Sequence, residues 1–88
     1  MAGCEHLEAA AGRDPAPGSR TACQDCLALG REEWAHLRMC TECGHVACCD
    51  SSPLRHATGH HRDSGHPVVR SFEPGESWAW CYVDERLG

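Results

Sequence analysis

The sequence predicts a small α+β domain that is held together by cross-links rather than by a large apolar core. The chain has 88 residues, the length of one domain, and Leu, Ile, Val and Phe make up only 11 of them. So few apolar side chains cannot offset an ordering cost of roughly 1–2 kcal/mol per residue. Cysteine occupies 8 of the 88 positions, a level typical of cross-linked scaffolds. We therefore expect one domain over residues 1–88, stabilised by disulfides or by metal ions.

The first part of the chain predicts a loop and then a strand. Residues 8–22 are small, polar and interrupted by proline and glycine, which is typical of a loop. Residues 33–39 predict a strand. Because side chains alternate along a strand, Trp34, His36 and Arg38 share one side of it.

A second short strand, at residues 45–48, precedes the main helix that the sequence predicts. Ser52 is a suitable N-cap residue, and Pro53 suits the first helical position. We expect this helix to run to about His61 and to end before the Gly-His-Pro segment at residues 65–67.

Two further strands follow, at residues 68–72 and 77–83, with a Pro-Gly turn at residues 74–75 between them. We expect the strands to form a short antiparallel sheet that packs with one or two helices. The fold class is therefore α+β.

Cysteine and histidine residues occur at spacings that are typical of zinc sites. Cys23–Cys26 and Cys40–Cys43 form two C-x-x-C pairs, a spacing that lets both sulfurs point to one side of a tight turn. Gly44 suits such a turn because glycine tolerates a positive φ. Further Cys and His residues follow these pairs: Cys48, Cys49, His56, His60, His61, His66 and Cys81.

Disulfides explain this pattern less well than zinc does. The first residues lack the basic and apolar regions of a secretory signal, so we expect a reducing, cytoplasmic compartment in which disulfides are rare. Disulfides would also leave the regularly spaced histidines without a role. We therefore expect zinc.

Net charge and composition exclude several classes of protein. A formal charge of −5 without a basic cluster argues against nucleic-acid binding. No apolar run approaches the roughly 18–20 residues of a membrane span. All eight basic residues are Arg, and Lys, Ile and Asn are absent, which favours a GC-rich genome such as that of many bacteria.

Taken together, these motifs resemble the UBP-type zinc finger, the ubiquitin-binding domain of many deubiquitinating enzymes, some E3 ligases and a histone deacetylase. The matching motifs are C-x-H, C-x-x-C, a Trp before C-x-x-C-G-H-V with a following Cys, H-x3-H-H-x3-G-H-P, and W-C-Y near the end. The resemblance runs from Cys4 to Asp84 and implies a stand-alone bacterial member with three zinc ions.

The three-zinc version of the family implies a set of ligands. The first zinc takes Cys23, Cys26, Cys48 and His56, and the second takes Cys40, Cys43, His60 and His66. The third takes Cys4, His6, Cys81 and Asp84, with Asp84 at the place of the family's fourth Cys. A carboxylate can ligate zinc at about 2.0–2.2 Å, although we expect this site to be the weakest. Four remaining metal-capable residues are expected to be bystanders: His36, His45, Cys49 and His61.

The resemblance also implies a pocket for the Gly-Gly carboxylate of a free ubiquitin tail, lined by aromatic residues that match Trp34, Trp80 and Tyr82. An Arg holds the carboxylate in the family, but this chain has Asp50 at that place, which should repel a carboxylate. We therefore expect a different protein or peptide tail, with a free C-terminus among the candidates. Three arginines could supply the positive charge instead: Arg55, Arg62 and Arg70.

Strand alternation supports a binding role for the last strand. Cys81 must point to zinc, so the aromatic residues Trp78, Trp80 and Tyr82 share the opposite face. They form either an exposed binding strip or a second core surface.

The sequence thus predicts a monomeric, non-enzymatic zinc-binding module for protein interaction. One alternative is a redox- or zinc-responsive switch that uses zinc thiolates and Cys49. A second alternative is a metal-dependent hydrolase, in which Asp84 would leave the third zinc open and Glu5 or Glu85 would act as the base.

Overall fold

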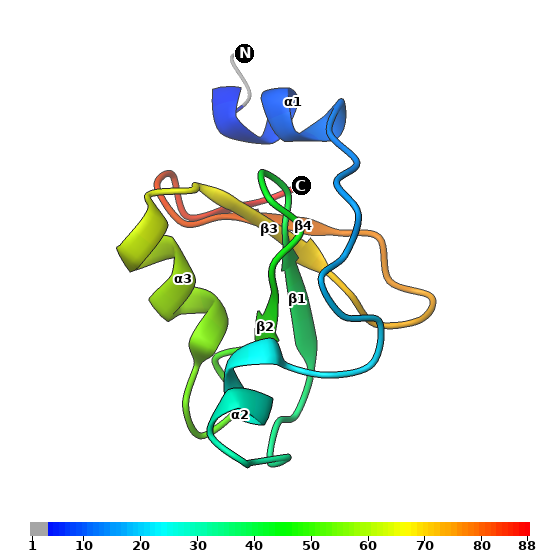
Figure 1. Cartoon of the computed structure of the whole chain (residues 1–88). Helices are drawn as coiled ribbons and strands as arrows, with labels where there is room; N and C mark the ends of the chain where they lie inside the picture. Colours follow the sequence, from blue (N-terminus) through cyan, green and yellow to red (C-terminus); the bar gives the residue numbers. More distant parts are fainter. Residues whose placement is uncertain (1–3) are drawn as a thin grey trace.

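The computed structural model describes residues 4–88, which form a five-stranded antiparallel sheet and three short helices (Figure 1). The helices are α1 (Glu5–Ala11), α2 (Gln24–Ala28) and α3 (His56–Ser64). The strands are β1 (Leu37–Cys40), β2 (Val46–Cys48), β3 (Val68–Ser71), β4 (Ala79–Cys81) and β5 (Arg86–Leu87). The α+β class is confirmed, with one helix more than the two expected at most. Figure 1 shows α1 and α2 at opposite ends of the molecule and α3 alongside the sheet.

The strand order is β2-β1-β3-β4-β5, and the register decides which side chains share a face. Cys40 pairs with Val69, and Val69 pairs with Trp80. Because directly paired residues lie on the same face, Arg38, two residues before Cys40, lies on the face of Val69 and Trp80. Ala79 and Cys81 point to the other face, as the alternation in the last strand predicts.

The loop expected at residues 8–22 is only partly confirmed, because α1 extends to Ala11. Residues 9–11 are three consecutive alanines, the strongest helix formers, and Glu5 and Glu8 lie in the first turn, where acidic side chains favour the helix dipole. The prolines and glycines that predict a loop begin only at Gly12.

The start of the third helix differs from the prediction by three residues, since Pro53 was expected at its first position. Ser52 does not cap a helix; it is buried, and its Oγ accepts a hydrogen bond from the Ala35 N–H at 2.8 Å. The helix begins at His56, after Arg55 in the left-handed conformation (φ 46°). It runs to Ser64, three residues beyond His61, and ends before Gly65 as predicted; the φ of Gly65 is 76°.

The strands at residues 45–48 and 68–72 and the turn at 74–75 are confirmed to within one residue. The first predicted strand is displaced, because Trp34 and His36 precede β1. The last is shorter than predicted, and a two-residue strand, β5, follows it.

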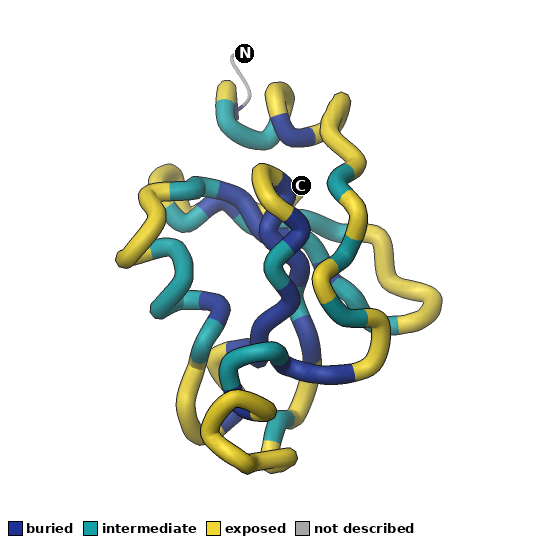
Figure 2. The backbone as a smooth tube through the Cα atoms, viewed as in Figure 1, coloured by how far each residue is buried: buried dark blue, intermediate teal, exposed yellow. Residues whose placement is uncertain are grey.

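The core is small and consists largely of cysteine. Burial is greatest along β1, β2 and β3, whereas β5 and much of the connecting loops are exposed (Figure 2). The largest fully buried side chains are Met39, Val46, Val68, Cys23, Cys26, Cys40, Cys48 and Cys81. None of the eight cysteines, all of which lie within residues 4–88, forms a disulfide. Within residues 4–88, no helix has the length and apolar character needed to cross a membrane.

Candidate metal centres and the neighbouring cavity

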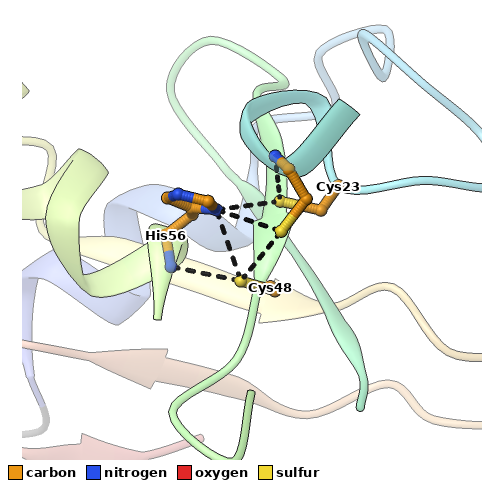
Figure 3. Close-up of side chains that lie close together, drawn as sticks. Cys23, Cys48 and His56 are labelled. Atoms are coloured by element: carbon orange, nitrogen blue, oxygen red, sulfur yellow. Dashed lines mark hydrogen bonds between the residues drawn. The ribbon is translucent and has the colours of Figure 1, made fainter. Parts of the chain in front are cut away.

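The first group of metal-capable side chains joins α2, β2 and α3 (Figure 3). His56 Nδ1 lies 3.4 Å from Cys23 Sγ and 3.3 Å from Cys26 Sγ. It lies 3.6 Å from Cys48 Sγ, and the Cys26 and Cys48 sulfurs are 3.9 Å apart. A tetrahedral zinc ion requires S···N distances of about 3.5 Å and S···S distances of about 3.8 Å. The four side chains therefore fit one zinc ion.

Backbone hydrogen bonds and burial make these sulfurs suitable for binding a cation. The N–H of Cys26 donates to Cys23 Sγ at 3.4 Å, and the N–H of His56 donates to Cys48 Sγ at 3.2 Å. Burial, together with the neighbouring sulfurs of Cys23 and Cys48, raises the pKa of the Cys26 thiol to about 12. Without a cation the Cys26 thiol would therefore keep its proton at neutral pH, and a bound metal ion would allow it to ionise.

The second group lies where β1 ends and α3 leads into β3. Cys40 Sγ is 3.3 Å from His66 Nδ1, and Cys43 Sγ is 3.4 Å from His60 Nε2. Both distances match the S···N edge of a zinc tetrahedron. His60 is one turn after His56 on α3, so this helix contributes to the first two groups.

The turn between Cys40 and Cys43 depends on the glycine that follows it. Gly44 has a φ of 80°, and its N–H donates to Cys40 O at 2.9 Å. A Cβ at this position would lie 2.1 Å from Ala16 O. Gly44 is therefore required both for the turn and for the close approach of the preceding loop, as the sequence predicts for the turn.

The third group connects α1 to the β4–β5 hairpin. It contains Cys4, His6, Cys81 and Asp84, whose ligand atoms all lie within 4.8 Å of one another. Asp84 Oδ2 is 3.1 Å from His6 Nδ1, near the value of about 3.3 Å for two zinc ligands of this kind. The Cys4 thiol donates a hydrogen bond to Asp84 Oδ2 at 2.8 Å, which is shorter than an S···O ligand edge of about 3.6 Å.

The Cys4 thiol and the His6 ring hold the pKa of Asp84 below its usual range. Asp84 is therefore ionised at neutral pH, which is the state in which a carboxylate ligates zinc.

A cavity of about 250 Å³ lies on the sheet face of Trp80. Trp78, Trp80 and Tyr82 line it, together with the charged residues Arg38 and Asp50. Trp34 is not among its lining residues; this ring packs against the buried cluster that contains the first metal group.

Comparison with known proteins identifies the family. A family model described as "Zn-finger in ubiquitin-hydrolases and other protein" matches residues 23–87. The chain belongs to the UBP-type zinc-finger family. The matched range includes ten of the twelve residues in the three groups and begins after Cys4 and His6.

Two similar proteins extend the comparison for this UBP-type zinc finger. It is 34% identical over 83 residues to histone deacetylase 6 of Caenorhabditis elegans, a match that covers 93% of this chain but only 8% of that protein. The solution NMR structure of a Rhodopseudomonas palustris protein has a TM-score of 0.82 and 46% identity. This match covers 99% of this chain and 81% of that one.

As a UBP-type zinc finger, the chain binds zinc, and the three side-chain groups match the three zinc sites expected from the sequence. Within residues 4–88 the groups contain all twelve residues predicted as ligands, in the predicted combinations.

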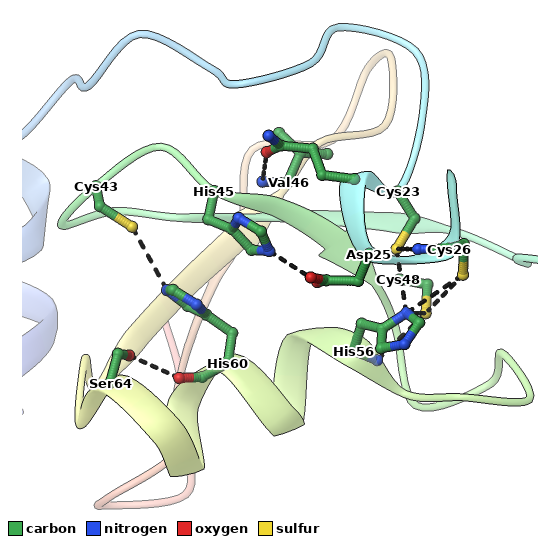
Figure 4. Close-up of polar contacts among 11 residues, drawn as sticks. Cys23, Asp25, Cys26, Cys43, His45, Val46, Cys48, His56, His60 and Ser64 are labelled. Atoms are coloured by element: carbon green, nitrogen blue, oxygen red, sulfur yellow. Dashed lines mark hydrogen bonds and ion pairs between the residues drawn. The ribbon is translucent and has the colours of Figure 1, made fainter. Parts of the chain in front are cut away.

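The histidines expected to be bystanders stay outside the three groups, but one of them lies between two groups (Figure 4). His45 Nε2 is 2.7 Å from Asp25 Oδ2, and its ring stacks on His60 at a centroid distance of 4.6 Å. Asp25 lies inside the Cys23–Cys26 pair. The His45–Asp25 pair therefore connects the first group to the second, a role that spacing alone does not indicate.

The cavity contains an arginine that was not among the three predicted from the sequence. Arg38 lines it, whereas Arg55, Arg62 and Arg70 do not. Arg70 instead pairs with Asp14 at 2.9 Å. The sequence places Arg38 on one side of the first predicted strand. Only the pairing of that strand with the later strands shows that this side faces the cavity.

Proposed function

We propose that this UBP-type zinc finger is a zinc-stabilised, non-catalytic module that binds the end of a protein or peptide chain in the cavity above the sheet. The main support for this proposal is the row of aromatic side chains along the cavity, Trp78, Trp80 and Tyr82. Aromatic rings supply a large contact area, and Trp and Tyr keep a polar group for hydrogen bonding. A volume of about 250 Å³ is below the roughly 300–1,000 Å³ of drug-sized ligand sites, which suits one or two residues of a chain end.

The zinc ions are proposed to be structural. Each group offers four ligand atoms, which is the closed coordination of structural zinc. The proposed ligands are Cys23, Cys26, Cys48 and His56 for the first ion; Cys40, Cys43, His60 and His66 for the second; and Cys4, His6, Cys81 and Asp84 for the third. With Asp84 as a ligand, the third site has no open position for a hydrolytic water.

The ligand is proposed to differ from a ubiquitin tail. Asp50 lines the cavity at the sequence position where the resemblance implies a carboxylate-binding Arg. The Asp50 carboxylate would repel a ligand whose only charged group is another carboxylate.

An NMR titration of zinc-loaded, ¹⁵N-labelled protein tests this proposal. The probes are peptides with free or amidated C-termini, including one that ends in Gly-Gly, and the observed signals are the indole N–H groups. We expect shifts of Trp78 and Trp80, and at least tenfold weaker binding after Trp80→Ala.

Val83→Ala is the matched control, because Val83 is exposed, lies near Trp80 in the sequence and does not line the cavity. Unchanged affinity in Trp80→Ala, with Val83→Ala binding equally well, would contradict the proposal.

A further inference from the structure

The cavity contains one positive and one negative side chain that do not neutralise each other. Arg38 and Asp50 both line it. Neither takes part in any of the six ion pairs found among residues 4–88. A ligand that fills this cavity therefore meets a cation and an anion, each available for pairing.

Arg38 is held in place without a carboxylate partner. Its guanidinium lies 4.4 Å from the centroid of the Trp78 ring, and Nη1 donates to Leu37 O at 3.0 Å. One N–H of five is therefore used by this bond. The remaining donors lie in one plane, which is the geometry that binds a carboxylate through two parallel hydrogen bonds.

Asp50 is oriented by the helix that also carries zinc ligands. The Thr58 hydroxyl donates to Asp50 Oδ1 at 2.5 Å. Thr58 lies between His56 and His60 on α3, so the proposed zinc sites hold this hydroxyl in position. Asp50 Oδ2 has no hydrogen bond within the described part of the chain, and it remains available for a cation or an N–H donor of a ligand.

We infer that the preferred ligand is a dipolar chain end: a peptide with a free C-terminal carboxylate and a basic side chain, Arg or Lys, on its last residue. This inference rests on the proposed function of the cavity. The carboxylate binds Arg38, and the basic group binds Asp50. The apolar stem of the basic side chain lies against Trp80 and Tyr82, as such stems do on apolar surfaces.

Charge complementarity favours this ligand over simpler ones. A Gly-Gly end would satisfy Arg38 and leave Asp50 facing a carboxylate. An amidated basic end would satisfy Asp50 but would offer Arg38 no carboxylate. Only an end with both charges pairs each side chain with its opposite.

Four peptides of identical sequence, except for the last residue and its terminus, test the inference by calorimetry. They end in Arg or Gly, each as the free acid or the amide. We expect the Arg free acid to bind at least tenfold more tightly than the other three. Arg38→Gln should remove the preference for the free acid, and Asp50→Asn should remove the preference for Arg.

A conservative variant, Arg38→Lys, controls for effects caused by a loss of structure. Arg38→Lys keeps the charge but not the planar fork, so it should retain a smaller preference for the free acid than the unaltered protein. Zinc content, measured for each variant, shows whether the fold is intact.

Equal binding of free-acid and amidated peptides, or of Arg and Gly ends, would overturn the inference. If Trp80→Ala still abolishes that binding, the proposed function stands and only the charge assignment fails. Absence of binding by all four peptides would overturn both.

Discussion

Single residues decide whether the metal-binding turns can form, and Gly44 shows this most clearly. Its φ of 80° is a conformation that side chains disfavour, and Ala16 O occupies the space that a Cβ would need. Gly59 differs, because it lies inside α3 with nothing within 4 Å of an added Cβ. The two glycines should therefore respond oppositely to the same substitution.

Gly44→Ala should lower the free energy of unfolding of the zinc-loaded protein by about 2 kcal/mol or more, because positive φ and the backbone clash add. Gly59→Ala should raise it by about 0.5–1 kcal/mol, because alanine favours a helix interior over glycine. Thermal unfolding measures both. Equal stability of Gly44→Ala and the unaltered protein would contradict the role assigned to Gly44.

Asp84 is the residue on which the third zinc site depends. Asp84→Ala should leave two tightly bound zinc ions and release α1, which the third group ties to β4. Native mass spectrometry measures the zinc content, and limited proteolysis measures the release of α1. Asp63→Ala is the control, because Asp63 is an exposed acid outside the groups. A third zinc ion bound as tightly in Asp84→Ala as in Asp63→Ala would exclude Asp84 as a ligand.

At the scale of elements, local signals predicted the strands near the ligands better than the helix starts. The runs at residues 45–48 and 68–72 contain valines and have turn residues beside them, so their boundaries could be predicted. The start of α3 could not, because the Ser52 hydroxyl binds the distant Ala35 N–H instead of capping a helix. Tertiary contacts of this kind leave no pattern in the neighbouring sequence.

The same distinction applies to the candidate site. The metal groups could be predicted because ligand spacing and the family resemblance both depend on sequence order. Arg38 and Asp25 could not, because their roles depend on strand register and on the position of α2 beside β2.

The contact between α2 and the second metal group depends on His45. His45→Ala removes the stacking on His60 and the bond to Asp25, so zinc affinity at the second site should fall by about tenfold, as for other outer ligand partners. Competition with a chromophoric chelator measures this affinity. His36→Ala is the control, since His36 pairs with Glu73 away from the groups. An equal effect of both substitutions would contradict a bridging role for His45.

At the scale of the whole molecule, zinc binding and folding are a single process. Structural zinc contributes about 10–16 kcal/mol of apparent binding free energy, whereas a small domain has a total stability of about 5–15 kcal/mol. The proposed ligands also form much of the buried core. We therefore expect loss of the ion from the first site to unfold the sheet around it.

Acid should release the zinc ions in a defined order. Thiolates and imidazoles must lose their protons to bind zinc, so zinc affinity falls as the pH falls. The third site has a carboxylate where the first site has a third thiolate and the second site has a second imidazole. Because this harder oxygen ligand binds the borderline-soft zinc ion less tightly, the third site should release its ion first. Native mass spectra recorded at decreasing pH measure the order, and simultaneous loss of all three ions would contradict it.

The zinc content of the folded chain decides whether zinc ions hold this domain together. We predict three zinc ions per chain by native mass spectrometry, with loss of the folded state when a chelator removes them. A chain that remains folded with no zinc, or with its cysteines paired as disulfides, would contradict it.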